Sequence, residues 1–347
     1  MVRLLERYVK YFPVTSGTPI ISIGEGNTPL VRLDNLGVKL GIELYGKCEG
    51  LNPTGSFKDR GMVLAVAKAL EAGSKGIICA STGNTSASAA AYAAKAKLKC
   101  HVVLPAGKVA KGKLAQALMY GANVLAVRGN FDVALDMTRR LASDLGLNIV
   151  NSVNPYRLWG QRSGAWEVSD EIGSPDWCVL PVGNAGNITA YWAGFVQYKN
   201  AGLIDAIPKM IGVQAQGAAP LVTGKPFQNP ETVATAIRIG NPVNAKKAMA
   251  AVKSSNRMFL AVSDEEILKA QRDLASSEGI FAEPASCVTL AGLYKLKRNG
   301  YLPKGIRVVM VLTGNGLKDP MIVDYMVSPP KEVEADFDDL KEAIMSC

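Results

Sequence analysis

The chain contains a single histidine, His101, among its 347 residues. Catalytic pairs built on histidine and histidine-rich metal sites are therefore not expected. Proton transfer must instead use lysine, a carboxylate, tyrosine, or a bound cofactor or substrate. His101 itself lies in the run K-C-H-V-V-L-P, whose apolar character predicts a strand.

Paired cysteines and long apolar runs are also missing. The six cysteines form no C-x-x-C pair, which argues against a disulfide framework and against a structural zinc site. No stretch approaches the roughly 18 consecutive apolar residues of a membrane-spanning helix. The first ten residues mix charges into an amphipathic helix pattern rather than a signal-peptide core, so we expect a cytoplasmic protein.

The net charge of +9 could indicate nucleic-acid binding, but the lysines and arginines are spread along the whole chain. No basic block alternates with aromatic residues, as it does in many nucleic-acid-binding proteins. Small anionic ligands suit this charge distribution better. We therefore expect a small-molecule substrate, and neither a nucleic-acid partner nor a membrane partner.

What the sequence has instead is a regular alternation of β-branched runs and helical patterns. With 347 residues, 48% of them apolar, the chain is long enough for two domains. The alternation predicts an α/β fold with two domains of open, mostly parallel sheets flanked by helices, and a cleft between them. The expected strands are 76–80, 101–104, 124–127, 148–150, 177–182, 209–214 and 307–312, and the expected helices are 62–70, 86–97, 111–120, 131–145, 188–198, 263–276 and 332–344.

Three loops rich in Gly, Asn, Ser and Thr follow strands of this pattern, where parallel sheets bind ligands. The first, S-T-G-N-T at 81–85, has more hydroxyls than a simple helix cap needs, which favours ligand binding over an ordinary capped turn. The second, G-N-A-G-N at 183–187, is typical of an anion-binding nest, the alternative being a glycine-rich turn without a ligand. The third, L-T-G-N-G at 312–316, places the Thr313 hydroxyl at the end of the last strand.

A fourth loop is similar in part to a nucleotide-binding motif, the P-loop. G-K-V-A-K-G-K-L at 107–114 has the glycine spacing and the lysine of a P-loop. Leu114, however, stands where a serine or threonine must hold magnesium. We interpret this stretch as a lysine-bearing loop before a helix.

Lys58 stands in N-P-T-G-S-F-K-D-R-G-M, where turn-forming residues lead into an apolar helix pattern. A single lysine is usually a solvated side chain. Together with a phosphate nest and other anion-binding turns, Lys58 suits a lysine that holds a phosphorylated aldehyde cofactor as a Schiff base.

Taken together, these stretches resemble the threonine synthase family, which belongs to the pyridoxal-phosphate enzymes of fold type II, the tryptophan-synthase-β-like fold. The resemblance covers nearly the whole chain in the right order. It rests on G-E-G-N-T-P-L at 24–30, K-C-E-G-L-N-P-T-G-S-F-K-D-R-G-M at 47–62, S-T-G-N-T-S at 81–86, P-V-G-N-A-G-N at 181–187, E-P-A-S at 283–286 and L-T-G-N-G at 312–316.

The resemblance implies a role for each cofactor-binding residue. Lys58 would hold pyridoxal 5′-phosphate covalently, Asn84 would bond its ring oxygen, and Thr313 would meet its ring nitrogen. A hydroxyl protonates the ring less strongly than an aspartate, so the ring would be a milder electron sink. The cofactor phosphate would be bound by Gly183, Asn184, Ala185, Gly186 and Asn187.

The resemblance also implies a reaction, the conversion of O-phospho-L-homoserine and water to L-threonine and phosphate as the last step of threonine biosynthesis. The substrate amine would displace Lys58, and the freed lysine would take the α-proton and then a β-proton. Phosphate would leave from Cγ and water would add at Cβ, with the departing phosphate as a hypothetical base.

The substrate contacts follow from the same resemblance. The loop with Ser81, Thr82, Asn84 and Thr85 would clamp the substrate. The segment N-S-V-N-P-Y-R at 151–157 would bind the substrate phosphate, through the residues Asn151, Ser152 and Arg157. Arginine suits a phosphate dianion because its guanidinium is a two-pronged donor. The alternative for Arg157 is a surface arginine after a turn.

We expect a large cofactor-binding domain, 1–56 plus 153–347, and a small substrate-side domain, 57–152, that closes with 81–97 as its mobile part. A homodimer is a family expectation. Plant-type relatives carry an N-terminal extension that responds to S-adenosylmethionine, and we expect no such activation here.

Three alternatives remain open at this stage. Two share the fold: a threonine or serine dehydratase, and a β-replacing synthase of the cysteine synthase kind. Those relatives usually have a more uniformly glycine phosphate loop and need no second phosphate site. The third alternative is a non-catalytic metabolite-binding α/β protein, against which the presence of Lys58, Asn84 and Thr313 argues.

Overall fold

The computed structural model describes residues 2–106, 111–129, 131–325, 327 and 330–346. Within these residues the strands form two separate sheets. One has the order β1 (Leu30–Arg32), β2 (Glu43–Cys48), β10 (Arg307–Leu312), β7 (Trp177–Pro181), β8 (Lys209–Ala215) and β9 (Phe259–Val262). The other has the order β5 (Asn123–Val127), β4 (Lys99–Pro105), β3 (Gly76–Ala80) and β6 (Asn148–Ile149).

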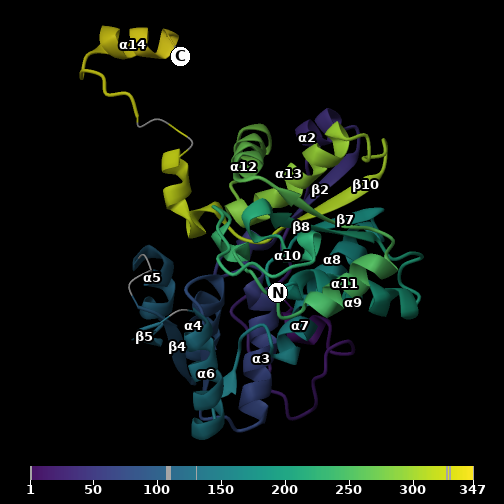
Figure 1. The fold of residues 1–347 in the computed structure, drawn as a ribbon, viewed down its shortest axis with the longest axis vertical. Helices are drawn as coiled ribbons and strands as arrows, with labels where there is room; N and C mark the ends of the chain where they lie inside the picture. Colours follow the sequence, from purple (N-terminus) through teal and green to yellow (C-terminus); the bar gives the residue numbers. More distant parts are fainter. Residues whose placement is uncertain (1, 107–110, 130, 326, 328–329, 347) are drawn as a thin grey trace.

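Apart from the antiparallel pair β1–β2, the strand pairs of the described residues are parallel, as the sequence predicted. The smaller sheet with its helices lies at the lower left of Figure 1 and the larger sheet at the upper right. The α-helices are α1 (Leu4–Arg7), α2 (Asp34–Leu40), α3 (Lys58–Glu71), α4 (Asn84–Lys95), α5 (Lys111–Met119), α6 (Phe131–Leu145), α7 (Pro155–Gln161), α8 (Ser163–Ile172), α9 (Gly186–Asn200), α10 (Pro220–Thr223), α11 (Ala245–Ser254), α12 (Asp264–Glu278), α13 (Pro284–Arg298) and α14 (Phe337–Met345).

The strands and helices predicted from the alternation are present, most of them within one or two residues of the expected ends. Helix α12 begins at its predicted capping box, in which Ser263 and Glu266 bond each other's backbone amides. The elements that were not predicted are the long helix α13 and several shorter ones, namely β1, β2, β9, α2, α7, α8, α10 and α11. Short elements give few repeats of the hydrophobic period, so tertiary packing decides them.

The last helix is shorter than predicted. The expected helix 332–344 begins only at Phe337, because the Asp336 side chain accepts hydrogen bonds from the Asp338 and Asp339 amides and caps the helix there. No residue of α14 is buried, and Figure 1 shows it standing away from the two sheets. The apolar stripe of this helix, including Phe337, Leu340 and Ile344, is therefore exposed.

A continuous apolar core joins the two sheets. It includes residues of β3 and β4, helix α3, and residues of β7 and α9. Helix α3 is buried on all sides from Asp59 to Ala67. The predicted boundaries at 57 and 152 enclose the smaller sheet and helices α3 to α6, while closure of this unit stays a prediction.

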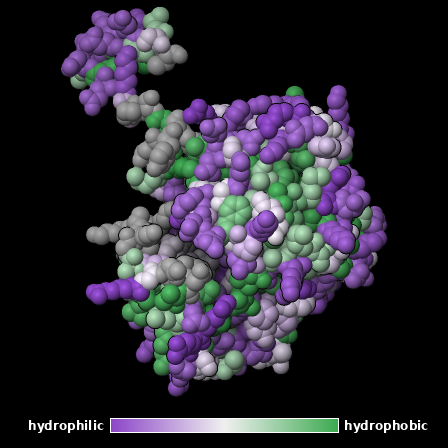
Figure 2. Space-filling model, in the orientation of Figure 1, coloured by the Kyte–Doolittle hydropathy of each residue, from purple (hydrophilic) through white to green (hydrophobic). Residues whose placement is uncertain are grey.

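The structure also places the cysteines and the exposed apolar side chains. The five cysteines among the described residues are buried thiols. No helix of the described part of the chain is long and apolar enough to cross a bilayer. Figure 2 shows mixed polar and apolar surface, with apolar surface gathered around the smaller sheet, where Met119, Leu125, Met137 and Leu141 are exposed. The P-loop-like stretch 107–114 lies partly outside the described residues, and its residues from Lys111 onward belong to α5.

Candidate active site

Lys58 is the first residue of α3, at the junction where the sequence placed it. The loop before it pairs with the segment after β10: the Phe57 amide donates to the Thr313 carbonyl oxygen at 3.0 Å, and the Asn315 amide donates to the Gly55 carbonyl oxygen at 3.0 Å. These bonds bring Lys58 beside the carboxyl end of β10, where parallel sheets bind ligands.

Asp59 holds this turn in place. Its carboxylate accepts from the Thr54 amide at 2.8 Å, from the Thr54 hydroxyl at 2.6 Å and from the Ser88 hydroxyl of α4 at 2.6 Å. Burial raises the pKa of Asp59 to about 6, against the effect of these donors. Asp59 thus ties the turn that carries Lys58 to the helix that carries Asn84.

The amine of Lys58 is unusually easy to deprotonate. Burial, followed by the positive charge of Arg157, lowers the pKa of Lys58 to about 7, whereas Glu283 acts in the opposite direction. A large fraction of the amine is therefore neutral near pH 7, and a neutral amine is the form that attacks an aldehyde.

A buried ion network anchors α3 two residues further on. The Arg60 guanidinium lies between Glu49 and Glu167, with shortest nitrogen–oxygen distances of 2.6 Å to each. Lys47 lies 2.9 Å from the same Glu167 carboxylate. Burial alone would lower the pKa of Arg60, but the two carboxylates raise it well above its usual value. The network therefore fixes the start of α3 against β2 and α8.

Asn84 and Thr313, the residues expected to contact the cofactor ring, both form hydrogen bonds with the carboxyl group of Glu283. Asn84 Nδ2 donates to Glu283 Oε2 at 2.9 Å, and Thr313 Oγ1 lies 2.9 Å from Glu283 Oε1. Ser286 Oγ lies 3.0 Å from Thr313 Oγ1 and accepts from the Gly314 amide at 3.1 Å. Burial raises the pKa of Glu283. The motif E-P-A-S contained this residue, but the sequence assigned it no role.

The loop 183–187 has the form of an anion nest. Ala185 has a φ of +60°, the left-handed conformation that turns successive amides to one side before α9 begins at Gly186. Within the described residues, the amides of 183–187 have no hydrogen-bond acceptor. A Cβ on Gly183 would lie 2.9 Å from the Cα of Ile237, so only glycine fits there.

Asn187 supports the same interpretation. It is 7% exposed, and neither its Oδ1 nor its Nδ2 has a hydrogen-bond partner among the described residues. Buried polar atoms without a partner are costly, so a ligand is expected to satisfy them. The residues of this loop therefore fit a phosphate group.

The loop 81–85 leads into α4. The Ser81 hydroxyl accepts from the Gly83 amide at 3.2 Å, which leaves the first amides of α4 facing outward from the helix end. The side chains of Thr82 and Thr85 are half-buried, and within the described residues they make no hydrogen bond. The helix end and these hydroxyls could bind a carboxylate.

The segment 151–157 follows β6 and runs into α7, which begins at Pro155. The side-chain amide of Asn151 bonds the backbone of Ala80: Oδ1 accepts from the Ala80 amide at 3.0 Å, and Nδ2 donates to the Ala80 carbonyl oxygen at 2.8 Å. Asn151 therefore supports the loop after β3. Its direct contact with the substrate stays a prediction. Asn244 donates to the carbonyl oxygens of Ser152, at 3.4 Å, and Asn184, at 3.3 Å, which joins this segment to the nest.

Arg157 is not a surface residue, so that alternative is wrong. It is 2% exposed and donates to the Val150 carbonyl oxygen at 2.6 Å, while its Nε has no partner. Burial lowers the pKa of Arg157 to about 10. No carboxylate of the described residues lies within ion-pair distance of it. A buried cation without a counter-ion is a natural place for a bound anion.

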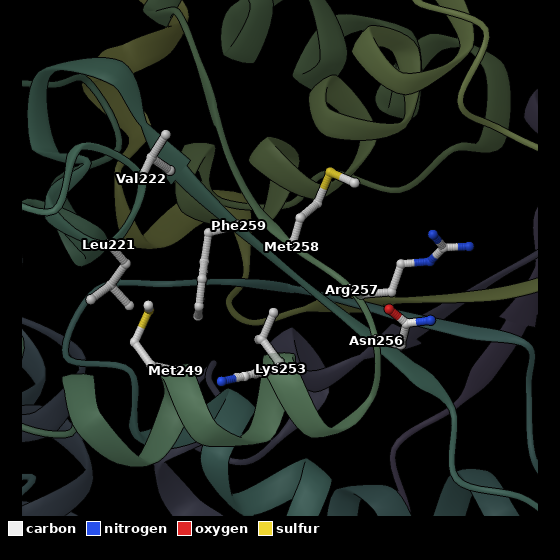
Figure 3. Close-up of a pocket in the computed structure, with 9 residues that line it drawn as sticks. Leu221, Val222, Met249, Lys253, Asn256, Arg257, Met258 and Phe259 are labelled. Carbon is white, nitrogen blue, oxygen red and sulfur yellow. The ribbon is translucent and has the colours of Figure 1, made fainter.

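A hollow of about 390 Å³ lies elsewhere, over α11 and β9, and contains none of these residues. In Figure 3 Leu221, Met249 and Phe259 gather in it, while Arg257 and Asn256 point away from them. Its polar groups do not converge, so we do not consider it the reaction site.

The chain is similar to known proteins over most of its length. The family pattern of the pyridoxal-phosphate dependent enzymes matches residues 21–314. The chain is 56% identical over 320 residues to a threonine synthase of Synechocystis, covering 91% of this chain and 83% of that one. It is 52% identical over 349 residues to a threonine synthase of Methanocaldococcus jannaschii, covering 97% and 86%.

Solved structures share the fold. Maize serine racemase matches with a TM-score of 0.76 at 19% identity, covering 87% of this chain and 92% of that one. The processed form of threonine deaminase isoform 2 from Solanum lycopersicum matches with a TM-score of 0.73 at 22% identity, covering 92% and 82%. The chain has fold type II and belongs to the pyridoxal-phosphate-dependent enzymes, within the threonine synthase family.

Proposed function

We propose that this enzyme converts O-phospho-L-homoserine and water to L-threonine and phosphate. The observation that carries the proposal is a pair of separate anion sites, one of which, Arg157, is close enough to Lys58 for its charge to lower the pKa of that lysine. The nest at 183–187 suits the phosphate of the cofactor, and the unpaired, buried guanidinium of Arg157 suits the phosphate of the substrate. A dehydratase, whose substrate carries no phosphate, has no need of the second site.

Pyridoxal phosphate, when bound, supplies the electron sink that stabilises negative charge on the substrate carbons. Lys58 would hold it covalently, and the amides of Gly183, Asn184, Ala185, Gly186 and Asn187 would bind its phosphate. Asn84 and Thr313 would contact its ring. The unpartnered amide of Asn187 supports this assignment.

The chain's own residues would bind the substrate and move its protons. The amides at the start of α4, with Ser81, Thr82 and Thr85, would bind the substrate carboxylate. Arg157 would bind the phosphate that leaves, with Asn151 and Ser152 beside it. Lys58, with a pKa of about 7, would take protons at Cα and Cβ and return protons at Cγ, which becomes the methyl group, and at Cα, since a base works best near the working pH.

The test is a product assay with O-phospho-L-homoserine. We expect phosphate and threonine to be released in equal amounts. Formation of a keto acid from threonine or serine, without turnover of phosphohomoserine, would overturn the proposal in favour of a dehydratase.

We further propose a homodimer, for which the exposed apolar stripe of α14 offers a surface. Light scattering of the purified protein tests this. A cytoplasmic location, the lack of a nucleic-acid partner and the closure of the unit 57–152 on substrate stay predictions.

A further inference from the structure

Glu283 occupies an unusual position at the start of α13. It is the N-cap residue, yet its side chain does not cap the helix. The carboxyl group turns instead toward Asn84 of α4 and Thr313 at the end of β10, and it is 4% exposed. A Cβ on Gly314 would collide with it, so the main chain closes over the carboxyl group. Glu283 thereby joins the two sheets at the expected cofactor ring.

In the part of the chain that the structure describes, Glu283 lacks the cationic partner that two other buried carboxylates, those of Glu49 and Glu167, possess. Glu49 and Glu167 each form an ion pair with Arg60. Within the described residues, no lysine or arginine lies within ion-pair distance of Glu283. The nearest charges that act on it, Lys58 and Lys318, are weaker influences than its burial. A buried carboxyl group without a cationic partner favours its neutral form.

The hydrogen-bond inventory agrees with a neutral acid. A carboxylic acid has one donor, its O–H, and one acceptor, its carbonyl oxygen. Asn84 can only donate through Nδ2, so it takes the carbonyl oxygen. The O–H then faces the Thr313 hydroxyl, which also meets Ser286. Either hydroxyl can be the donor in the Ser286–Thr313 bond. If Glu283 donates to Thr313 Oγ1 and Ser286 Oγ does the same, the proton of the Thr313 hydroxyl is free for another acceptor.

We propose that Glu283 is a positioning residue whose carboxyl group stays protonated and donates a hydrogen bond to the Thr313 hydroxyl. The hydroxyl proton of Thr313 is thereby directed toward an unprotonated ring nitrogen of the cofactor. Through its other oxygen, Glu283 holds Asn84 with its NH₂ group available to the ring oxygen. The inference rests on the proposed function and deepens it, because it gives both ring contacts a defined direction. An ionised Glu283 would instead accept a hydrogen bond from the Thr313 hydroxyl, whose proton would then not point toward the ring nitrogen.

The first measurement is infrared difference spectroscopy of the cofactor-loaded protein, wild type minus Glu283→Gln. Glutamine has the donor and acceptor of the neutral acid, so the variant preserves both bonds. We expect the carbonyl band of a protonated carboxyl group, shifted in D₂O, in the wild type only. A carboxylate band lost in the variant would overturn the inference. Ser286→Ala, which removes the other neighbour of Thr313, serves as the control and keeps the acid band.

The second measurement is the ¹⁵N chemical shift of the ring nitrogen in labelled cofactor. We expect the shift of an unprotonated, hydrogen-bonded nitrogen in both the wild type and Glu283→Gln. A protonated nitrogen in the wild type would contradict the inference. In Glu283→Ala, where both bonds are lost, we expect cofactor retention to weaken by about tenfold or more.

The two proposals fail separately. Turnover of phosphohomoserine without the acid band refutes only the role of Glu283. The acid band without that turnover refutes only the proposed reaction.

Discussion

Gly61 of α3 lies directly against the main chain of Arg157 on α7. A Cβ on Gly61 would stand 2.5 Å from the Arg157 carbonyl oxygen and 3.1 Å from its Nε. The contact places the helix that begins with Lys58 against the helix that carries the unpaired guanidinium. The separation of Lys58 and Arg157 therefore depends on Gly61, whose lack of a side chain lets the two helices approach closely.

Gly61→Ala tests this packing. Because the added methyl group meets backbone rather than a flexible side chain, we expect the free energy of unfolding to fall by about 1–3 kcal/mol or more. Chemical denaturation measures it. Gly17→Ala is the control, since a Cβ at Gly17 meets only the Thr15 hydroxyl at an ordinary 3.7 Å. Equal stability of the two variants would show that the helices have room to separate.

Lys58→Ala should abolish the visible absorbance of the lysine-bound cofactor and lower turnover by roughly 10³-fold, as expected for a lost nucleophile and base. Absorbance spectra and phosphate release measure the two effects. Lys68→Ala, on the same helix but paired with Glu71, should change neither. A variant at Lys58 that retains the covalent absorbance would refute the assignment.

The cofactor-free protein should react with amine-labelling reagents at Lys58 with a midpoint near pH 7, far below the ordinary lysine value of 10.5. The reaction rate should rise with pH because only the neutral amine attacks. Mass spectrometry of the Lys58 peptide across a pH series measures it. A midpoint close to that of a lysine peptide would contradict the burial argument.

The same pKa affects stability. Between about pH 7 and 10.5 the unfolded chain binds the Lys58 proton and the folded protein does not. The free energy of unfolding of the cofactor-free protein should therefore gain a contribution that rises with pH across this window and is constant below it. Denaturation of Lys58→Met should lack that contribution. If the free energy of unfolding depends on pH in the same way in the wild type and in Lys58→Met, Lys58 makes no such contribution.

Arg157→Met should raise KM for phosphohomoserine by roughly 10²-fold, because a buried charge-assisted contact to the phosphate is lost. Steady-state kinetics measure the change, and Arg157→Lys should recover part of it. Arg162→Met is the matched control, since its half-buried guanidinium stacks on Trp159, at 3.4 Å from the ring centre. An unchanged KM in Arg157→Met would remove Arg157 from the substrate site.

The sequence alone determined the local elements and the places where chemistry occurs. The alternation of strands and helices, the capping box at Ser263 and the helix start at Lys58 follow from side-chain periodicity and from caps within a few residues. The loops at 81–85, 183–187 and 312–316 follow strands, which placed them at one edge of each sheet.

Only the tertiary structure decided the burial and pairing of these groups. Asn84 and Glu283 are 199 residues apart in sequence, and Glu283 and Thr313 are 30 apart, yet they share one hydrogen-bonded cluster. The unpaired guanidinium of Arg157 and the lowered pKa of Lys58 depend on residues from distant segments that exclude water. Local pattern carries no information on such desolvation, because solvent exclusion arises only when the two sheets pack together.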